Sequence, residues 1–152
     1  MLARDLAVPC PSVGLDDEAL DAVRLMAERH LPGIVVCDAS GRPVDILPGS
    51  QVLAFVIPHY VRDDATLARV MSERDSERLI RDLAGKTVRE LVSAESDHEL
   101  AVARPDDTVL ELAVLMARTH SPLVAVVDNH RLVGCVTLPL LLDVLLAGPR
   151  ES

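Results

Sequence analysis

Apolar and polar residues follow one pattern twice along this chain. Residues 16–38 and 106–128 align without a gap and are identical at 10 of 23 positions. In the first copy, apolar residues recur at helical spacing on one face. Acidic residues begin each helix, where negative charge complements the helix dipole, and Pro32 and Pro122 end it. The pattern predicts two copies of one supersecondary unit that pack against each other.

Each expected helix is flanked by short apolar segments typical of strands and is followed by turn residues. The expected pairs are extended segments near 12–15 and 101–104, strands at 34–37 and 123–127, strands at 43–47 and 131–136, and closing helices at 50–57 and 139–146. Each copy therefore reads strand, helix, strand, strand, helix. The predicted fold class is α/β (α+β), with two such repeats packed against each other.

The chain divides into four segments on this pattern: a first repeat at 1–60, a helical insertion at 61–86, a second repeat at 87–148 and a tail at 149–152. The insertion is rich in charge, but Leu67, Val70 and Met71 recur at helical spacing, and so do Leu79, Ile80 and Leu83. One or two amphipathic helices docked on the repeats are expected there. Two interpretations stay open, a solvated connection and a surface that binds a partner.

The helix of the second copy is unusually apolar, since only Glu111 is charged between Val109 and Ala117. A helix that is apolar nearly all round must be covered on more than one side. A second subunit is one source of cover, which predicts a homodimer. Burial under helices of the same chain is the alternative.

Charge and composition remove several classes of partner. The net charge is −9, which disfavours binding to a nucleic-acid backbone or to an anionic membrane surface. With one Tyr and one Phe, the chain also lacks rings on which bases stack. Hydrophobic residues make up 49% of the chain, so a sizeable aliphatic core is expected instead.

The cysteines and the chain start indicate a cytoplasmic protein. Cys10, Cys37 and Cys135 are odd in number and scattered, which suits a reducing compartment. No signal peptide is expected, because the N-terminus lacks a basic region followed by an apolar run. The apolar stretch at 132–147 is broken by polar residues and a proline, so no insertion into a membrane is expected either.

No sequence motif for catalysis or metal binding stands out. The five histidines form no His-x-x-x-His pair, and no Cys-x-x-Cys pair exists, so no metal site is expected. No nucleophile elbow or phosphate-cradling glycine loop occurs, so the chain is expected not to be an enzyme. His30 and His120 end equivalent helices, where a cation suits the dipole. Lining a cleft between the copies is their alternative role.

The duplicated order resembles the CBS-domain pair, the regulatory module named after cystathionine beta-synthase. In both copies it runs Asp-Asp, Leu-Met-Ala, His-x-Pro and an aliphatic strand ending in Asp, and residues 131–137 then form a second strand that leads into a helix. The resemblance covers most of the chain outside the insertion and looks like a stand-alone pair. It implies two repeats packed with pseudo-two-fold symmetry, dimerisation and a regulated enzyme, channel or transporter. It also implies clefts that bind AMP, ADP, ATP or S-adenosylmethionine.

The family's ligand motif is only partly present. It runs Gly, two residues, Thr or Ser, two residues, Asp, and the acid would accept hydrogen bonds from the ribose hydroxyls. The second copy has Gly134 and Thr137, but Leu140 replaces the acid. In the first copy Pro48 replaces the hydroxyl and Gln51 replaces the acid, although an amide still hydrogen-bonds a ribose.

The second copy is the better candidate for a ligand site. The resemblance implies that the base would be framed by the segment from Ala101 to Ala103 and by His120, Ser121 and Pro122. Thr137 has an alternative role as an ordinary helix N-cap. Two functions therefore stay open: a non-catalytic sensor of an adenosine ligand, and a structural dimerisation or protein-interaction module whose clefts have lost the ligand.

Overall fold

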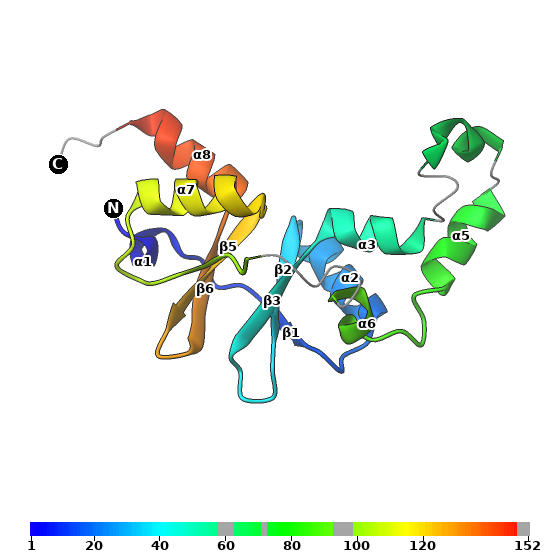
Figure 1. Cartoon of the computed structure of the whole chain (residues 1–152), viewed down its shortest axis with the longest axis horizontal. Coiled ribbons are helices and arrows are strands. Elements are labelled where there is room, and N and C mark those ends of the chain that lie inside the picture. The colour runs from blue at the N-terminus through cyan, green and yellow to red at the C-terminus, as the bar shows by residue number, and fades with distance from the viewer. Residues whose placement is uncertain (58–62, 71–72, 93–98, 149–152) are drawn as a thin grey trace.

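Two three-stranded sheets form the centre of the protein. The computed structural model describes residues 1–57, 63–70, 73–92 and 99–148, so the expected tail at 149–152 lies outside the described residues. The strand orders are β1-β2-β3 and β4-β5-β6, and the sheets stand side by side (Figure 1). In each sheet the first pair of strands is parallel and the second is an antiparallel hairpin. This matched topology confirms the predicted fold class.

Both repeats have the predicted order of elements. The first contains β1 (Ser12–Gly14), α2 (Ala19–Arg29), β2 (Gly33–Cys37), β3 (Pro43–Pro48) and α3 (Gly49–Val56). The second contains β4 (Val102–Ala103), α7 (Val109–Thr119), β5 (Leu123–Asp128), β6 (Arg131–Thr137) and α8 (Leu138–Ala147). The described residues also form α1 (Ala3–Leu6), the 3₁₀ helix η1 (Ala65–Val70), α5 (Glu73–Arg81) and α6 (Val88–Val92).

Histidines, and not the prolines, end the long helices. His30 and His120 are the C-caps of α2 and α7, and both adopt left-handed backbone conformations with φ of 52° and 53°. The left-handed residue breaks the helix two positions before Pro32 or Pro122. The capping position expected for the two histidines is thus confirmed, and the prolines only prevent the helix from resuming.

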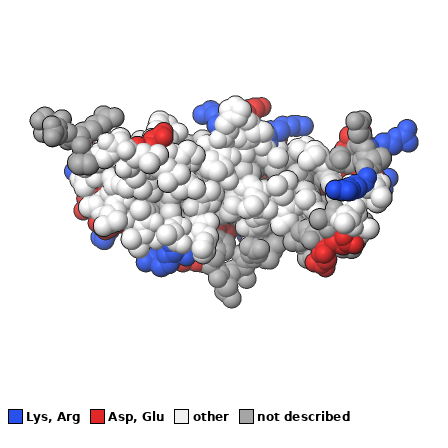
Figure 2. Space-filling view, turned by 90° about the horizontal axis from the view of Figure 1, so that it is seen from above, with Lys and Arg blue, Asp and Glu red and all other residues white. Residues whose placement is uncertain are grey.

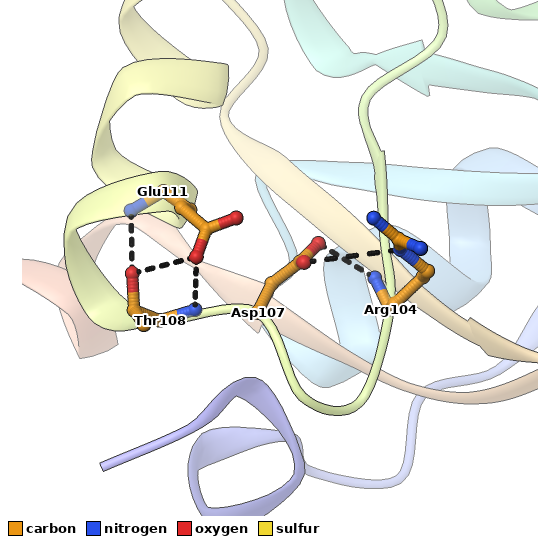
Figure 3. A network of polar contacts seen from close by, with 4 residues as sticks. All are labelled: Arg104, Asp107, Thr108 and Glu111. Atoms are coloured by element: carbon orange, nitrogen blue, oxygen red, sulfur yellow. Dashed lines mark hydrogen bonds and ion pairs between the residues drawn. The ribbon is translucent and has the colours of Figure 1, made fainter.

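A capping box fixes the start of α7 (Figure 3). The hydroxyl of Thr108 accepts a hydrogen bond from the main-chain N–H of Glu111 at 3.2 Å, and the Glu111 carboxylate accepts one from the main-chain N–H of Thr108 at 3.2 Å. Just before it, the Asp107 carboxylate accepts the main-chain N–H of Arg104 at 2.8 Å. These bonds satisfy main-chain donors that a helix start leaves unpaired.

The short helices that precede the repeats cross over to the opposite repeat. In α1, the main-chain N–H of Ala3 donates to the carbonyl of Asp107 at 2.7 Å. In α6, the main-chain N–H of Val88 donates to the carbonyl of Asp17 at 2.9 Å. Helix α1 lies before the first repeat in sequence but completes the second. Helix α6 lies before the elements of the second repeat but completes the first. The segment boundaries at 60/61 and 86/87 stay a prediction.

The side chains of β2 connect the two hydrophobic cores. Ile34 and Val36 point into the core of the first repeat, which also contains residues of α6. Val35 lies between them in sequence and packs into the other core, with Leu123 and Val124 of β5. Since successive strand residues face opposite sides, the first sheet is buried on both faces. The two repeats thus share a core across their sheets.

The insertion differs from the expected docked helices. Its described residues form η1 and α5, which extend away from the two sheets (Figure 1). Val70 and Ile80 are 81% and 49% exposed, whereas Leu83, just after α5, is fully buried in the core of the first repeat. Among the described residues of the insertion, docking on the core is therefore seen at the Leu83 end.

Candidate ligand-binding cleft

Three of the expected site residues meet at a cleft between the repeats. Ala101, His120 and Ser121 line it from the second repeat, and Ile46 and Pro48 of β3 line it from the first. The cavity volume is about 40 Å³. Sites for small molecules usually enclose roughly 300–1,000 Å³. The cleft lies where the family resemblance places the base, but in this structure its side chains nearly fill it.

The hydroxyl of Ser121 is hydrogen-bonded to the main chain of the protein. Its hydroxyl donates to the carbonyl oxygen of Leu123 at 2.6 Å, at the start of β5. Of the other residues expected near the base, Ala103 is buried and pairs with Val126 across the sheet. The carbonyl of Pro122 accepts the main-chain N–H of Leu138 at 2.9 Å. Ser121 and Ala103 therefore make structural contacts with β5, and Pro122 makes one with α8.

Thr137 and Leu140, the hydroxyl and acid positions of the second ligand motif, are not among the residues that line this cleft. Thr137 is the N-cap of α8, but its side chain makes no capping hydrogen bond. Leu140 lines a different cavity of about 640 Å³, together with Val109 of α7 and Val144 of α8. Thr137 thus retains a hydroxyl at a helix start, while the position of the missing acid lies against an apolar cavity.

Gln51 has a structural partner. Its side chain is buried, and Nε2 donates to the carbonyl oxygen of Leu91 at 2.8 Å. The amide that the sequence offered as a ribose contact therefore holds α3 to α6. A buried polar side chain with this bond made is costly to redirect, because the carbonyl would lose its donor.

Gly134 has a packing role that the motif did not reveal. A Cβ at this position would lie 2.7 Å from the carbonyl oxygen of Val8. The N-terminal segment runs along β6 here, with two main-chain hydrogen bonds between Val8 and Cys135 at 2.9 and 3.0 Å. Sequence reasoning missed this contact, because the two segments are far apart in the chain.

An ion pair stands beside the cleft, and the sequence did not single it out. Arg118 of α7 donates from Nε and a terminal nitrogen to the two carboxylate oxygens of Glu99, both at 2.8 Å. The hydrogen bonds that Arg118 donates to this carboxylate, and the charge of the carboxylate, raise the pKa of Arg118. Glu99 also lines the cleft. A spacing of 19 residues between two charged side chains carries no recognisable signal.

A broad apolar helical surface is the other functional feature. Leu110 of α7 is 71% exposed and Leu145 of α8 is 48% exposed. Val114 of α7, Leu142 of α8 and Leu53 of α3 are exposed as well. The view onto the side of these helices is largely uncharged (Figure 2). Contiguous exposed apolar surface is typical of an interaction site.

The part of the chain that is described offers no support for a metal site or a membrane-spanning helix. Among these residues, no three His, Cys, Asp or Glu side chains gather as metal ligands would. None of their helices is both long enough and apolar enough to span a bilayer.

Comparison with known proteins identifies the class that this fold defines. The family model for the CBS domain matches residues 3–58 and 88–147. The chain therefore belongs to the CBS-domain family and is a CBS-pair regulatory module.

Several solved structures share the architecture. A CBS domain-containing protein of unknown function from Kribbella flavida is 46% identical, with a TM-score of 0.79, 96% of this chain and 99% of that chain covered. CBSX2 in complex with AMP is 21% identical, with a TM-score of 0.67 and 98% of each chain covered. An uncharacterised protein of Methanocaldococcus jannaschii is 26% identical over 96% of this chain and 92% of its own length. At 21% identity, the AMP complex shows a shared fold alone.

Proposed function

We propose that this CBS pair is a non-catalytic, cytoplasmic regulatory module that works as a homodimer, joined through the helical surface of α7, α8 and α3. The observation that carries the proposal is the row of exposed leucines on α7 and α8. Burying one such side chain fully is worth roughly 1.5–3 kcal/mol, so several together are enough to drive association. The partner class expected for such a module is a separate enzyme, channel or transporter.

A second copy of the chain is the occupant that fits this surface best. A two-fold axis sets a surface against itself, so like charges must not face each other across it. The chain carries a net charge of −9, yet the exposed leucines of α7 and α8 form a surface that needs no opposite charge. An apolar surface is self-complementary under that symmetry, whereas a strongly charged one is not.

Light scattering coupled to size exclusion tests the dimer. The wild-type chain is expected at twice its monomer mass, and the double variant Leu142→Glu/Leu145→Glu at the monomer mass. Val133→Glu is the matched control, because Val133 is an apolar residue of β6 that is 52% exposed. It should leave the dimer intact. A monomeric wild-type chain at micromolar concentration contradicts the proposal.

A second candidate function is the sensing of AMP, ADP, ATP or S-adenosylmethionine in the cleft lined by Ala101, His120 and Ser121. The similarity to a structure that holds AMP favours it, and so does the Thr137 hydroxyl, which makes no capping bond. Against it stand the small cavity and Leu140 at the position of the acid. Binding would require the cleft to open. Only a ligand that binds the open state more tightly than the closed state would shift the population of the module toward the open state.

Calorimetry with each of the four compounds decides between the two functions. If the cleft does not open to any of these ligands, calorimetry shows no heat of binding at millimolar ligand, and the variant Leu140→Asp does not create binding. If the chain is a sensor, saturating ligand at about a hundred times Kd raises stability by roughly 3 kcal/mol. Binding that appears only in Leu140→Asp identifies a degraded site.

A further inference from the structure

All three cysteines lie at the junction of the two repeats. Cys37 ends β2 of the first repeat, and Cys135 lies within β6 of the second. Both belong to the core that the repeats share, and Cys10 packs against that core from the segment between α1 and β1. In the sequence the three thiols look scattered, because Cys37 follows Cys10 by 27 positions and Cys135 follows Cys37 by 98.

The pairing of the N-terminal segment with β6 brings Cys10 to Cys135. The main-chain N–H and carbonyl of Val8 bond with those of Cys135, at 3.0 and 2.9 Å. Cys10 follows two residues later and packs against the buried cluster that contains Cys135, and its interaction with the Cys135 thiol raises the pKa of Cys10. Cys37 lies in the same cluster, but the main cause that raises the pKa of its thiol is burial and not an interaction with Cys135.

A cavity gives a small molecule access to this junction. Its volume is about 430 Å³, and Cys10 and Cys37 line it together with Ser12 and Ser40. Cys10 is half-buried, whereas Cys135 is fully buried behind it. A small oxidant therefore reaches the sulfur of Cys10 first, and a bulky reagent does not reach Cys135.

We propose that Cys10 and Cys135 form a reversible, peroxide-driven disulfide that fastens the N-terminal segment to β6. The Cys10 thiolate attacks one oxygen of hydrogen peroxide, the O–O bond breaks, and the departing hydroxide takes up a proton to leave as water. The sulfenic acid on Cys10 is then attacked by the Cys135 sulfur. The S–S bond forms, and the oxygen leaves as a second water with the proton from Cys135. Two thiols are oxidised and one peroxide is reduced.

The environment of Cys10 makes this reaction slow near neutral pH. The hydrogen bond with Cys135 and then burial raise the pKa of the Cys10 thiol. Since the thiolate is the nucleophile, its population and the rate of oxidation rise with pH. The pair therefore stays reduced at low peroxide and responds to sustained or high exposure.

The crosslink would act on the junction between the repeats. Residues 3–6 already pack on the second repeat, and β1 pairs with β2 of the first. A bond from Cys10 to Cys135 restrains the segment between α1 and β1, which joins the contact with the second repeat to the contact with the first. It also closes a loop of more than a hundred residues, so a rise in Tm of roughly 5–15 °C is expected.

Peptide mapping of the full chain tests the proposal. Reduced protein is treated with hydrogen peroxide at a series of pH values, alkylated and digested without reductant. The wild-type chain is expected to lose the mass of two hydrogens and to yield a linked Cys10–Cys135 peptide, faster at higher pH. Dithiothreitol should restore both thiols and the original Tm.

Two single variants make the result specific. Cys37→Ser should form the same linked peptide, and Cys10→Ser should form none and show no rise in Tm. A Cys10–Cys37 peptide, a crosslink between two chains, or sulfinic acid on Cys10 without a crosslink overturns the proposal. So does the absence of any reaction in wild type and Cys37→Ser.

Discussion

Gln51 donates a hydrogen bond from its side-chain nitrogen to the carbonyl oxygen of Leu91, over 2.8 Å and 40 positions of sequence. Both residues are buried. The bond joins the last helix of the first repeat to the short helix that precedes the second, and so holds the crossed-over segment in place. A residue that stands at a ligand position of the sequence motif thus serves the packing of the repeats.

Gln51→Ala is expected to lower the free energy of unfolding by about 1–3 kcal/mol, because the buried Leu91 carbonyl loses its donor. Ser50→Ala is the matched control, since Ser50 is the exposed neighbour in the same helix. Urea denaturation followed by circular dichroism measures both. Equal effects of the two substitutions would contradict a structural role for Gln51.

Gly134→Ala is expected to destabilise the chain by about 1–3 kcal/mol, because the added methyl group meets the Val8 carbonyl oxygen at 2.7 Å. The N-terminal segment would be pushed from β6, so Arg4 should become more sensitive to trypsin. At Gly49 the new Cβ would lie 3.6 Å from the Pro32 carbonyl, an ordinary contact, so Gly49→Ala is the control. Unchanged proteolysis in Gly134→Ala would count against this account.

Thr108→Ala is expected to cost about 0.5–2 kcal/mol, because it removes the hydroxyl that accepts the Glu111 main-chain N–H. The N-cap of α2, Glu18, makes no side-chain capping bond, so Glu18→Ala should have much less effect. Chemical denaturation of the two variants measures the difference. If Glu18→Ala costs as much, the capping box does not stabilise α7.

The turn after β2 predicts a dependence on acid. Hydrogen bonds from the Ser40 hydroxyl and the Arg42 main-chain N–H lower the pKa of Asp38 below its ordinary value of 3.8. The folded state therefore binds fewer protons than the unfolded state near that pH. The stability that Asp38 contributes is fully present above pH 3.8 and is lost as the pH falls through the lower folded pKa.

Thermal melts below about pH 4 test this linkage. Asp38→Ala should lose less stability than the wild-type chain over that acid range, although it is less stable at neutral pH. Ser40→Ala should fall between the two, because it removes the largest cause of the shift. Parallel curves for all three proteins would rule the linkage out.

Local patterns were enough to predict each repeat. The spacing of Ala22 and Met26, the strand at Ile34 and the turn after it depend on contacts between near neighbours in sequence, and the structure places them as expected. The helix ends shifted by two residues, because a left-handed His30 and His120 could not be distinguished from ordinary helical residues. Neither histidine carries the positive-φ signal that a glycine would.

The candidate site was predicted only in part. Ala101, His120 and Ser121 do meet in a cleft, because Ala101 precedes β4, the two others precede β5, and parallel neighbouring strands begin at the same edge of a sheet. The small volume of that cleft and the role of Gln51 depend on how α6 and β3 pack from elsewhere in the chain. No motif records such contacts.

The sequence by itself determined the duplicated βαββα order, because hydrophobic periodicity is a local property that each copy repeats. Only the tertiary structure decided that α1 and α6 exchange repeats, that the cleft nearly closes, and that Cys10 packs against the core that contains Cys135. These contacts join residues distant in the chain, and side-chain volume and main-chain pairing fix them only once both repeats are packed together.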